Sequence, residues 1–199
     1  VADYHLYNNS SKEDYECEGI TINTNLRTNK DGTFFINNCN VKGTREGLSL
    51  MGQNAVIYIN GGVYQGVRHG GAYFGVKKTV VQNATFKKWD YDGQFEKDKL
   101  HSWNANFYVG ATLASPKVYM NNCKVDKNYK SVISSNYEYK DTYLYASNTS
   151  FGSVRIDGPN ENNNQGHFYM GKNTTYTSTE YNKSKVDTLG VLDETTYKD

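Results

Sequence analysis

The chain has 199 residues, of which 37% are hydrophobic, and its 22 Lys and Arg balance 21 Asp and Glu to a formal net charge of +1. Its mean hydropathy is −0.78. No run approaches the roughly 20 apolar residues of a membrane-spanning helix, so we expect no membrane insertion. The near-neutral charge lacks the basic excess that nucleic-acid-binding grooves usually carry, so we expect no nucleic-acid partner.

The composition favours strands over helices, because Asn, Tyr, Gly, Thr, Ser and Val are abundant while Leu and Ala are sparse. With only two prolines in the chain, turns must be made by Gly and Asn, which tolerate a positive φ.

One short phrase recurs along the chain: a β-rich apolar run, an Asn, two mostly small residues and an apolar residue. Its copies lie at 34–41, 56–63, 80–86, 118–125, 143–151 and 168–176. Aligned on Asn38, Asn60, Asn83, Asn122, Asn148 and Asn173, they are separated by 22, 23, 39, 26 and 25 residues. Further short strands are predicted at 47–50, 71–76, 106–109, 131–134 and 153–156.

Two or three short strands per unit of this length are typical of a solenoid whose rungs stack in parallel. The sequence therefore predicts an all-β fold, a parallel β-helix of about six to seven rungs. The recurring Asn suits a left-handed bend between two strands, and stacked copies are expected to form a hydrogen-bonded ladder. An antiparallel sandwich is the alternative, but it does not explain one residue type at the same phase of successive units.

The phase of the repeat divides the chain into three parts. Residues 19–178 are expected to form the β-helix domain, with an insertion at 87–104 that accounts for the 39-residue step. Residues 1–18 and 179–199 depart from the phase and are expected to be capping or connecting segments.

On the recurring phrase, residues 19–178 resemble the right-handed parallel β-helix superfamily, which includes pectate lyases, pectin methylesterases and phage tailspike or tail-associated proteins. The resemblance implies a right-handed helix and favours a phage tail or cell-surface module, located outside the cell or on a virion. A homotrimer or membership of a larger assembly is compatible with it. The motifs of pectin methylesterases are missing, so no catalytic residue is carried over and function must come from a site.

The insertion is the first candidate site, because it contains both tryptophans of the chain and because solenoid insertions often form binding faces. Aromatic rings beside polar groups suit sugar binding. We expect Trp89, Tyr91, His101 and Trp103, together with Arg45, to contact a polysaccharide or cell-surface glycan. The alternative is that the two tryptophans close a small core of the loop itself.

A charged edge beside the insertion is the second candidate site. By phase, Glu46 should lie next to Arg68 and His69, near Asp90 and Asp92. Paired carboxylates would serve a glycoside hydrolase, and a basic side chain that abstracts a proton would serve a polysaccharide lyase. The alternative is a solvated strip of ion pairs between rungs.

No metal or cofactor is expected. Asp90 and Asp92 form a fragment of a calcium loop that lacks its third acid and closing Glu, and the four histidines lack zinc spacing. Cys39 and Cys123 share a phase three copies apart, about 14 Å at 4.8 Å per rung, so three free thiols including Cys17 are predicted.

Three functional hypotheses remain open at this point. The first is a β-helix that scaffolds a glycan-contacting loop, the second a polysaccharide lyase or glycosidase, and the third a purely structural spacer.

Overall fold

The computed structural model describes residues 19–24, 32–43, 46–66, 70–88, 105–110, 114–134, 140–157, 162–182 and 189–191. These residues form strands and no helix, so none of them belongs to a helix that could cross a bilayer. The strands are β1 (Ile20–Asn23), β2 (Gly32–Asn37), β3 (Asn40–Gly43), β4 (Leu48–Asn60), β5 (Val63–Gly66), β6 (Ala72–Gln82), β7 (Thr85–Lys88), β8 (Ala105–Gly110), β9 (Lys117–Asn121), β10 (Lys124–Val125), β11 (Lys130–Ser134), β12 (Thr142–Ser147), β13 (Ser153–Asp157), β14 (Gly166–Met170), β15 (Ser178–Asn182) and β16 (Leu189–Val191).

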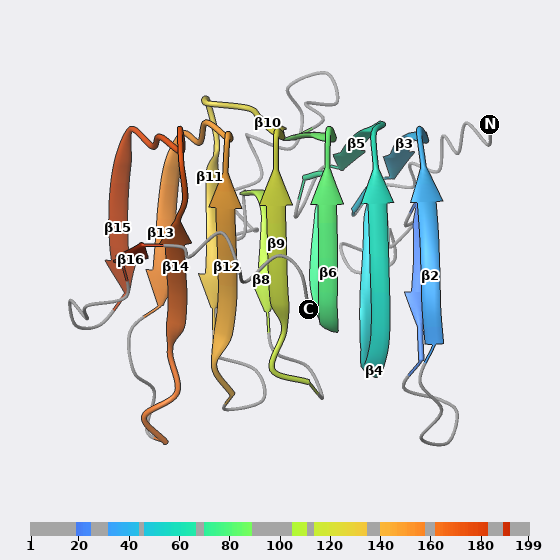
Figure 1. The fold of residues 1–199 in the computed structure, drawn as a ribbon, viewed down its shortest axis with the longest axis horizontal. Coiled ribbons are helices and arrows are strands. Elements are labelled where there is room, and N and C mark those ends of the chain that lie inside the picture. Colours follow the sequence, from blue (N-terminus) through green and yellow to red (C-terminus); the bar gives the residue numbers. More distant parts are fainter. Residues whose placement is uncertain are drawn as a thin grey trace, which may run out of the picture.

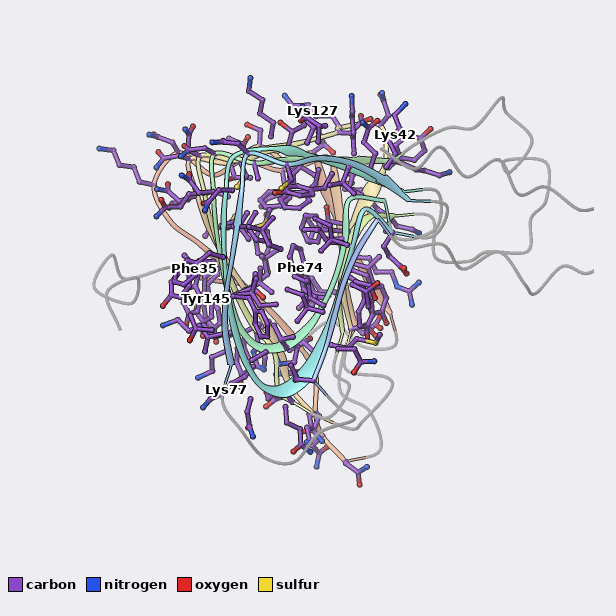
Figure 2. The ribbon with its side chains drawn as sticks, turned by 90° about the vertical axis from the view of Figure 1, so that its right-hand side faces the viewer. Phe35, Lys42, Phe74, Lys77, Lys127 and Tyr145 are labelled. Carbon is purple, nitrogen blue, oxygen red and sulfur yellow. The ribbon has the colours of Figure 1, made fainter. Side chains whose placement is uncertain are left out.

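The strands stack in parallel on three faces that enclose one core (Figures 1 and 2). The first face contains β1, the beginning of β4 and of β6, then β8, β11, β13 and β15. The second face contains β2, the ends of β4 and β6, then β9, β12, β14 and β16. The third face contains β3, β5, β7 and β10. Strands β4 and β6 are long because each continues from the first face to the second, across a register shift between Gly52 and Val56.

The architecture confirms the predicted all-β parallel solenoid, but with about five turns in place of six to seven. Toward the C-terminus the pairing of the third face is reduced to single bridges at Ser150 and Thr175. Parallel stacking also continues beyond the expected domain limit at residue 178, where β15 pairs with β13 and β16 pairs with β14.

The corner between the second and third faces is made by the recurring asparagines. Asn38, Asn83, Asn122, Asn148 and Asn173 have φ between 49° and 58°, the left-handed region that Asn tolerates better than other side chains. The predicted alignment is wrong by one residue in the second copy: Asn60 is in β4, paired with Asn37, and Gly61 takes the left-handed position with φ 72°.

Side-chain amides link these corners from rung to rung, which confirms the predicted ladder. Nδ2 of Asn83 donates to Oδ1 of Asn60 at 3.0 Å, and Nδ2 of Asn122 donates to Oδ1 of Asn83 at 2.8 Å. Further along, Asn148 donates to Asn121 at 2.8 Å and Asn173 to Asn148 at 3.1 Å. The ladder is exposed to solvent, so it aligns the rungs at the surface.

The core is a chain of aromatic rings packed edge to face along the solenoid. Phe107 contacts Phe74, Phe86 and Phe151 with ring centroids 5.8, 6.0 and 6.1 Å apart, and Phe151 contacts Phe168 at 5.4 Å. All five rings are essentially inaccessible to solvent. From β6 to β14, successive turns therefore bury large rings against one another, which compensates for the low overall hydrophobicity.

Two of the three predicted free thiols are confirmed, since Cys39 and Cys123 are unbridged. Cys17 lies outside the described residues.

Candidate functional site

The outward side of the second face presents side chains in three straight columns, because its strands pair in register from one turn to the next. The aromatic column consists of Phe35, Tyr58, Val80, Tyr119, Tyr145 and Tyr169. The amide column consists of Asn37, Asn60, Gln82, Asn121 and Ser147. The lysine column consists of Val56, Lys78, Lys117, Tyr143 and His167.

Rings of the aromatic column stack face to face along the solenoid axis. The ring centroid of Tyr145 lies 4.7 Å from that of Tyr119 and 5.0 Å from that of Tyr169, with interplanar angles of 7° and 11°. Phe35 and Tyr58 stack at 5.3 Å, and Val80 separates this pair from the tyrosines that follow. Because the stacked faces cover one another, the tyrosines turn ring edges and hydroxyl groups outward.

The start of the aromatic column is the part most accessible to a partner. Phe35 is 69% exposed and Tyr58 39%, and they are the large hydrophobic side chains recorded as exposed in the described ranges. Figure 2 shows Phe35 and Tyr145 on the same outer side of the solenoid, whereas Phe74 points inside. Two exposed stacked rings on a flat sheet are typical of a binding surface.

Burial disfavours ionisation of two hydroxyls of the column, those of Tyr119 and Tyr145, and so raises the pKa of each. It raises the pKa of Tyr145 to about 12, with a smaller contribution from the neighbouring Tyr119, Tyr169 and Tyr143. Burial also raises the pKa of Tyr119 above its ordinary value. At neutral pH these phenols are therefore hydrogen-bond donors as well as acceptors.

The lysine column places two ammonium groups beside the aromatic column. Nζ of Lys78 lies 5.6 Å from the ring centroid of Tyr119, and Nζ of Lys117 lies 5.8 Å from that of Tyr143. Each lysine thus reaches over a ring of the next rung, a cation–π contact that holds the ammonium group on the sheet.

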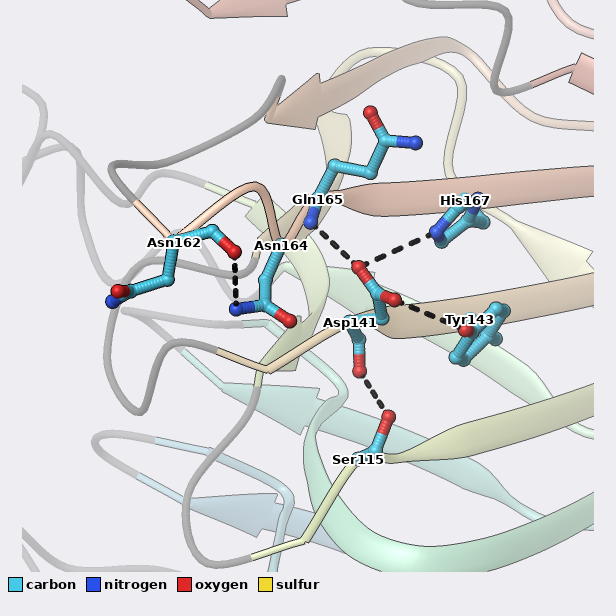
Figure 3. Close-up of polar contacts among 7 residues, drawn as sticks. All are labelled: Ser115, Asp141, Tyr143, Asn162, Asn164, Gln165 and His167. Atoms are coloured by element: carbon cyan, nitrogen blue, oxygen red, sulfur yellow. Dashed lines mark hydrogen bonds and ion pairs between the residues drawn. The ribbon is translucent and has the colours of Figure 1, made fainter.

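A polar cluster closes the end of the second face where its strands begin (Figure 3). Asp141 precedes β12; its Oδ1 accepts the backbone N–H of Gln165 at 2.8 Å and its Oδ2 accepts the hydroxyl of Tyr143 at 3.3 Å. Nε2 of His167 lies 3.5 Å from Oδ1 of Asp141, and the hydroxyl of Ser115 donates to the Asp141 carbonyl. These contacts join the starts of β9, β12 and β14, so the carboxylate has a structural role.

Among the catalytic residues expected from the sequence, the structure describes Glu46. This side chain is 1% exposed in the turn before β4, and its carbonyl accepts the N–H of Gly19 at 2.9 Å. Arg68, His69, Asp90 and Asp92 lie outside the described residues, as do the expected ligand-binding residues Arg45, Trp89, Tyr91, His101 and Trp103.

The insertion connects two faces other than the second. Its first two residues, Lys87 and Lys88, are the end of β7 on the third face, and Ala105, which follows it, begins β8 on the first face. The described ranges contain no group of three His, Cys, Asp or Glu that could hold a metal ion, and the weak calcium candidate Asp90 and Asp92 is outside them.

The aromatic column was missed by sequence reasoning, although a signal for it exists. Phe35, Tyr58, Tyr119 and Tyr145 each stand three residues before the left-handed corner residue of their rung. Aligning the copies on the corner and reading backwards would therefore have revealed an aromatic position beside the recurring Asn.

Comparisons with known proteins found no matching family model, no similar curated protein and no similar solved structure. The structure itself shows the parallel solenoid. No family match supports the resemblance to the pectate-lyase-like superfamily.

Proposed function

We propose that this protein is a β-solenoid binding module that holds a polysaccharide chain along the outer side of its second face. The observation that carries the proposal is the aromatic column flanked by the amide column, both repeating once per rung. Tyrosine hydroxyls and amides supply the donors and acceptors that sugar hydroxyls need, and ring edges supply apolar contact.

The regular spacing of the columns favours a polymer over a small ligand. Equivalent groups recur at the inter-strand distance of about 4.8 Å, which is comparable to the length of one sugar unit in an extended chain. Several weak contacts repeated along one polymer then add up, as in any multivalent interaction.

The 87–104 insertion, which joins β7 to β8 in the chain, would supply a separate contact. As part of the same proposal, the module is displayed outside the cell or on a virion, where glycans are accessible. The lyase or glycosidase hypothesis has no described residue pair in its favour.

Affinity electrophoresis of the full chain through gels that contain different soluble polysaccharides tests the proposal. We expect retardation by at least one polymer, and about tenfold weaker retention for a Phe35→Ser, Tyr58→Ser double variant that loses the two exposed rings. Because both rings are exposed, the variant should unfold near the parent's melting temperature.

A matched control is Trp89→Ala, which changes the insertion and leaves the second face intact. If the gel retained the Phe35→Ser, Tyr58→Ser variant but not Trp89→Ala, the binding site would lie in the insertion and not on the second face. No retardation by any polymer would contradict the proposed function, and release of reducing ends during the same incubation would favour the enzyme hypothesis.

A further inference from the structure

The charge pattern of the second face carries an inference about its ligand. Lys78 and Lys117 are directly opposite each other on the neighbouring strands β6 and β9. Their Cα atoms are therefore about 4.8 Å apart. Like charges placed side by side on a sheet destabilise it. The pair is thus a cost to the fold that a negatively charged ligand would remove.

The face itself does not neutralise these lysines. The aromatic, amide and lysine columns, as defined above, contain no carboxylate. Among the described residues, Asp141 immediately precedes β12, and its carboxylate accepts the N–H of Gln165 and the hydroxyl of Tyr143 and lies 3.5 Å from Nε2 of His167. Within the described part of the chain, Lys78 and Lys117 have no ion pair.

The ammonium groups are also held in place before a ligand arrives. Each lies over a tyrosine ring at 5.6 or 5.8 Å, so its side chain is already directed along the columns. A contact to the ring face occupies one side of an ammonium group and leaves its remaining N–H donors for an oxygen anion. Less side-chain freedom is lost on binding when the donor is already positioned.

We propose that the polymer bound on the second face is an acidic polysaccharide, and that Lys78 and Lys117 bind its carboxylate or sulfate groups. This inference rests on the proposed function. Nucleic acid, the other abundant linear polyanion, fits less well, because the tyrosine ring faces stack on one another and are not available to bases.

Two matched polymer pairs test the inference on the full chain. Dextran sulfate is compared with dextran, and polygalacturonate with its methyl ester, so that each pair differs in charge on a common backbone. We expect the acidic member of at least one pair to bind tenfold or more tightly, and salt to weaken it. The pair that discriminates tells sulfate from carboxylate recognition.

Variants then locate the charge. Lys78→Gln with Lys117→Gln should weaken acidic-polymer binding by about tenfold or more and reduce the dependence of log K on log salt by about two. Lys124→Gln with Lys127→Gln removes two exposed lysines, Lys124 in β10 on the third face and Lys127 shortly after it (Figure 2), and should change affinity less than twofold. Circular dichroism and melting temperature show whether each variant is folded.

Several outcomes would overturn the inference. Equal affinity for the neutral and acidic members of both pairs would refute it while leaving the proposed function intact. If both lysine double variants lost the same affinity for the acidic polymer, the effect would come from the net charge of the protein and not from Lys78 and Lys117. A single-stranded oligonucleotide that binds as tightly as the better acidic glycan would replace the glycan with nucleic acid, and absence of binding to every polymer would refute both proposals.

Discussion

Individual asparagines fix the corner between the second and third faces through their backbone conformation. Asn83 has φ 58°, and its side-chain amide donates to Asn60 and accepts from Asn122. An ordinary residue with a Cβ atom but without this amide would have to adopt a left-handed conformation that costs about 1–2 kcal/mol. The recurring Asn therefore combines a turn preference with a bond to the next rung.

We expect Asn83→Ala to lower the free energy of unfolding by about 1–2 kcal/mol, mostly through the left-handed backbone. Asn83→Gly should recover most of this loss, because Gly adopts positive φ without a penalty even though it lacks the ladder amide. Urea unfolding of the two variants measures the difference. If Gly were as damaging as Ala, the ladder bonds would be the dominant contribution.

Three tyrosines of the second face, Tyr119, Tyr143 and Tyr145, are expected to ionise at a higher pH than an ordinary tyrosine. The pKa of Tyr145 is raised to about 12, and those of Tyr119 and Tyr143 are raised above the ordinary value of 10.0, chiefly by burial. A group with a raised folded pKa contributes stability that is complete below its unfolded pKa, so this contribution is full below pH 10.0 and is lost as the pH rises toward about 12.

Ultraviolet absorbance of tyrosinate during an alkaline titration measures this behaviour. The native protein should show tyrosines that titrate above the range seen in denaturant, and Tyr145→Phe should remove part of that late phase. A native titration curve that coincides with the denatured one would contradict the burial of the column.

At the scale of elements, the second half of β6 (78–82) alternates between partly exposed and buried positions, and one of its buried positions is polar. Thr79 lies between Ile57 and Val118 on the inward side of the second face and is fully buried. Its hydroxyl has no hydrogen-bond partner among the described residues. Burying a hydroxyl without a partner is unfavourable, by about 1–3 kcal/mol.

Replacing Thr79 by Val should therefore stabilise the protein by about 1 kcal/mol, since the shape is kept and the unsatisfied hydroxyl is removed. Differential scanning calorimetry on both proteins checks this. A lower melting temperature in the Val variant would show that the hydroxyl is satisfied in solution.

The aromatic chain inside the solenoid links the elements of successive turns. Phe107 of β8 contacts rings from β6, β7 and the segment that follows β12. We expect Phe107→Ala to cost about 3–5 kcal/mol, because it leaves a cavity at the centre of this chain. Phe35→Ala, which truncates a ring that is 69% exposed, is the matched control and should cost far less; similar losses would contradict the assignment of inside and outside.

The same strands show how far the sequence could predict the structure. The expected strand at 106–109 corresponds to β8 and that at 131–134 to β11, because apolar runs between turn residues are a strong local signal. In the second copy, Asn60 and Gly61 both tolerate a left-handed turn, and only pairing with β2 decides between them.

The candidate site was less predictable for a related reason. Phe34, Phe35 and Ile36 are all apolar, so local alternation cannot show that Phe35 points outward; closure of the three faces around the core determines it. The tryptophans of the insertion stand out in the sequence because they lie where the repeat is interrupted, whereas the aromatic column is part of the repeat itself.

For the molecule as a whole, stacking in parallel couples the turns into one body, and the two described cysteines report on it. Cys39 is partly exposed, whereas Cys123 is 4% exposed and burial raises its pKa to about 11. In a Cys17→Ser background, Cys39 should react readily with a thiol reagent at neutral pH.

Cys123 should react only when the solenoid opens, at a rate that increases with urea as the protein unfolds. Measuring the number of modified thiols over time separates the fast reaction of Cys39 from the slow reaction of Cys123. A single fast phase of two thiols in the native protein would show that the turns around Cys123 open without global unfolding.

The fixed spacing of the columns also acts as a ruler. A polymer whose unit length differed from the rung spacing by about a tenth would be displaced by about half a rung over the roughly five turns of the stack. Sugar units that are aligned with the side chains of the columns at one end of the solenoid would then lie between rungs at the other end. The length of the solenoid and the mismatch in spacing together limit how many successive sugar units can bind in phase. A longer polymer would therefore offer more positions at which binding can begin, but each bound segment would not bind more tightly.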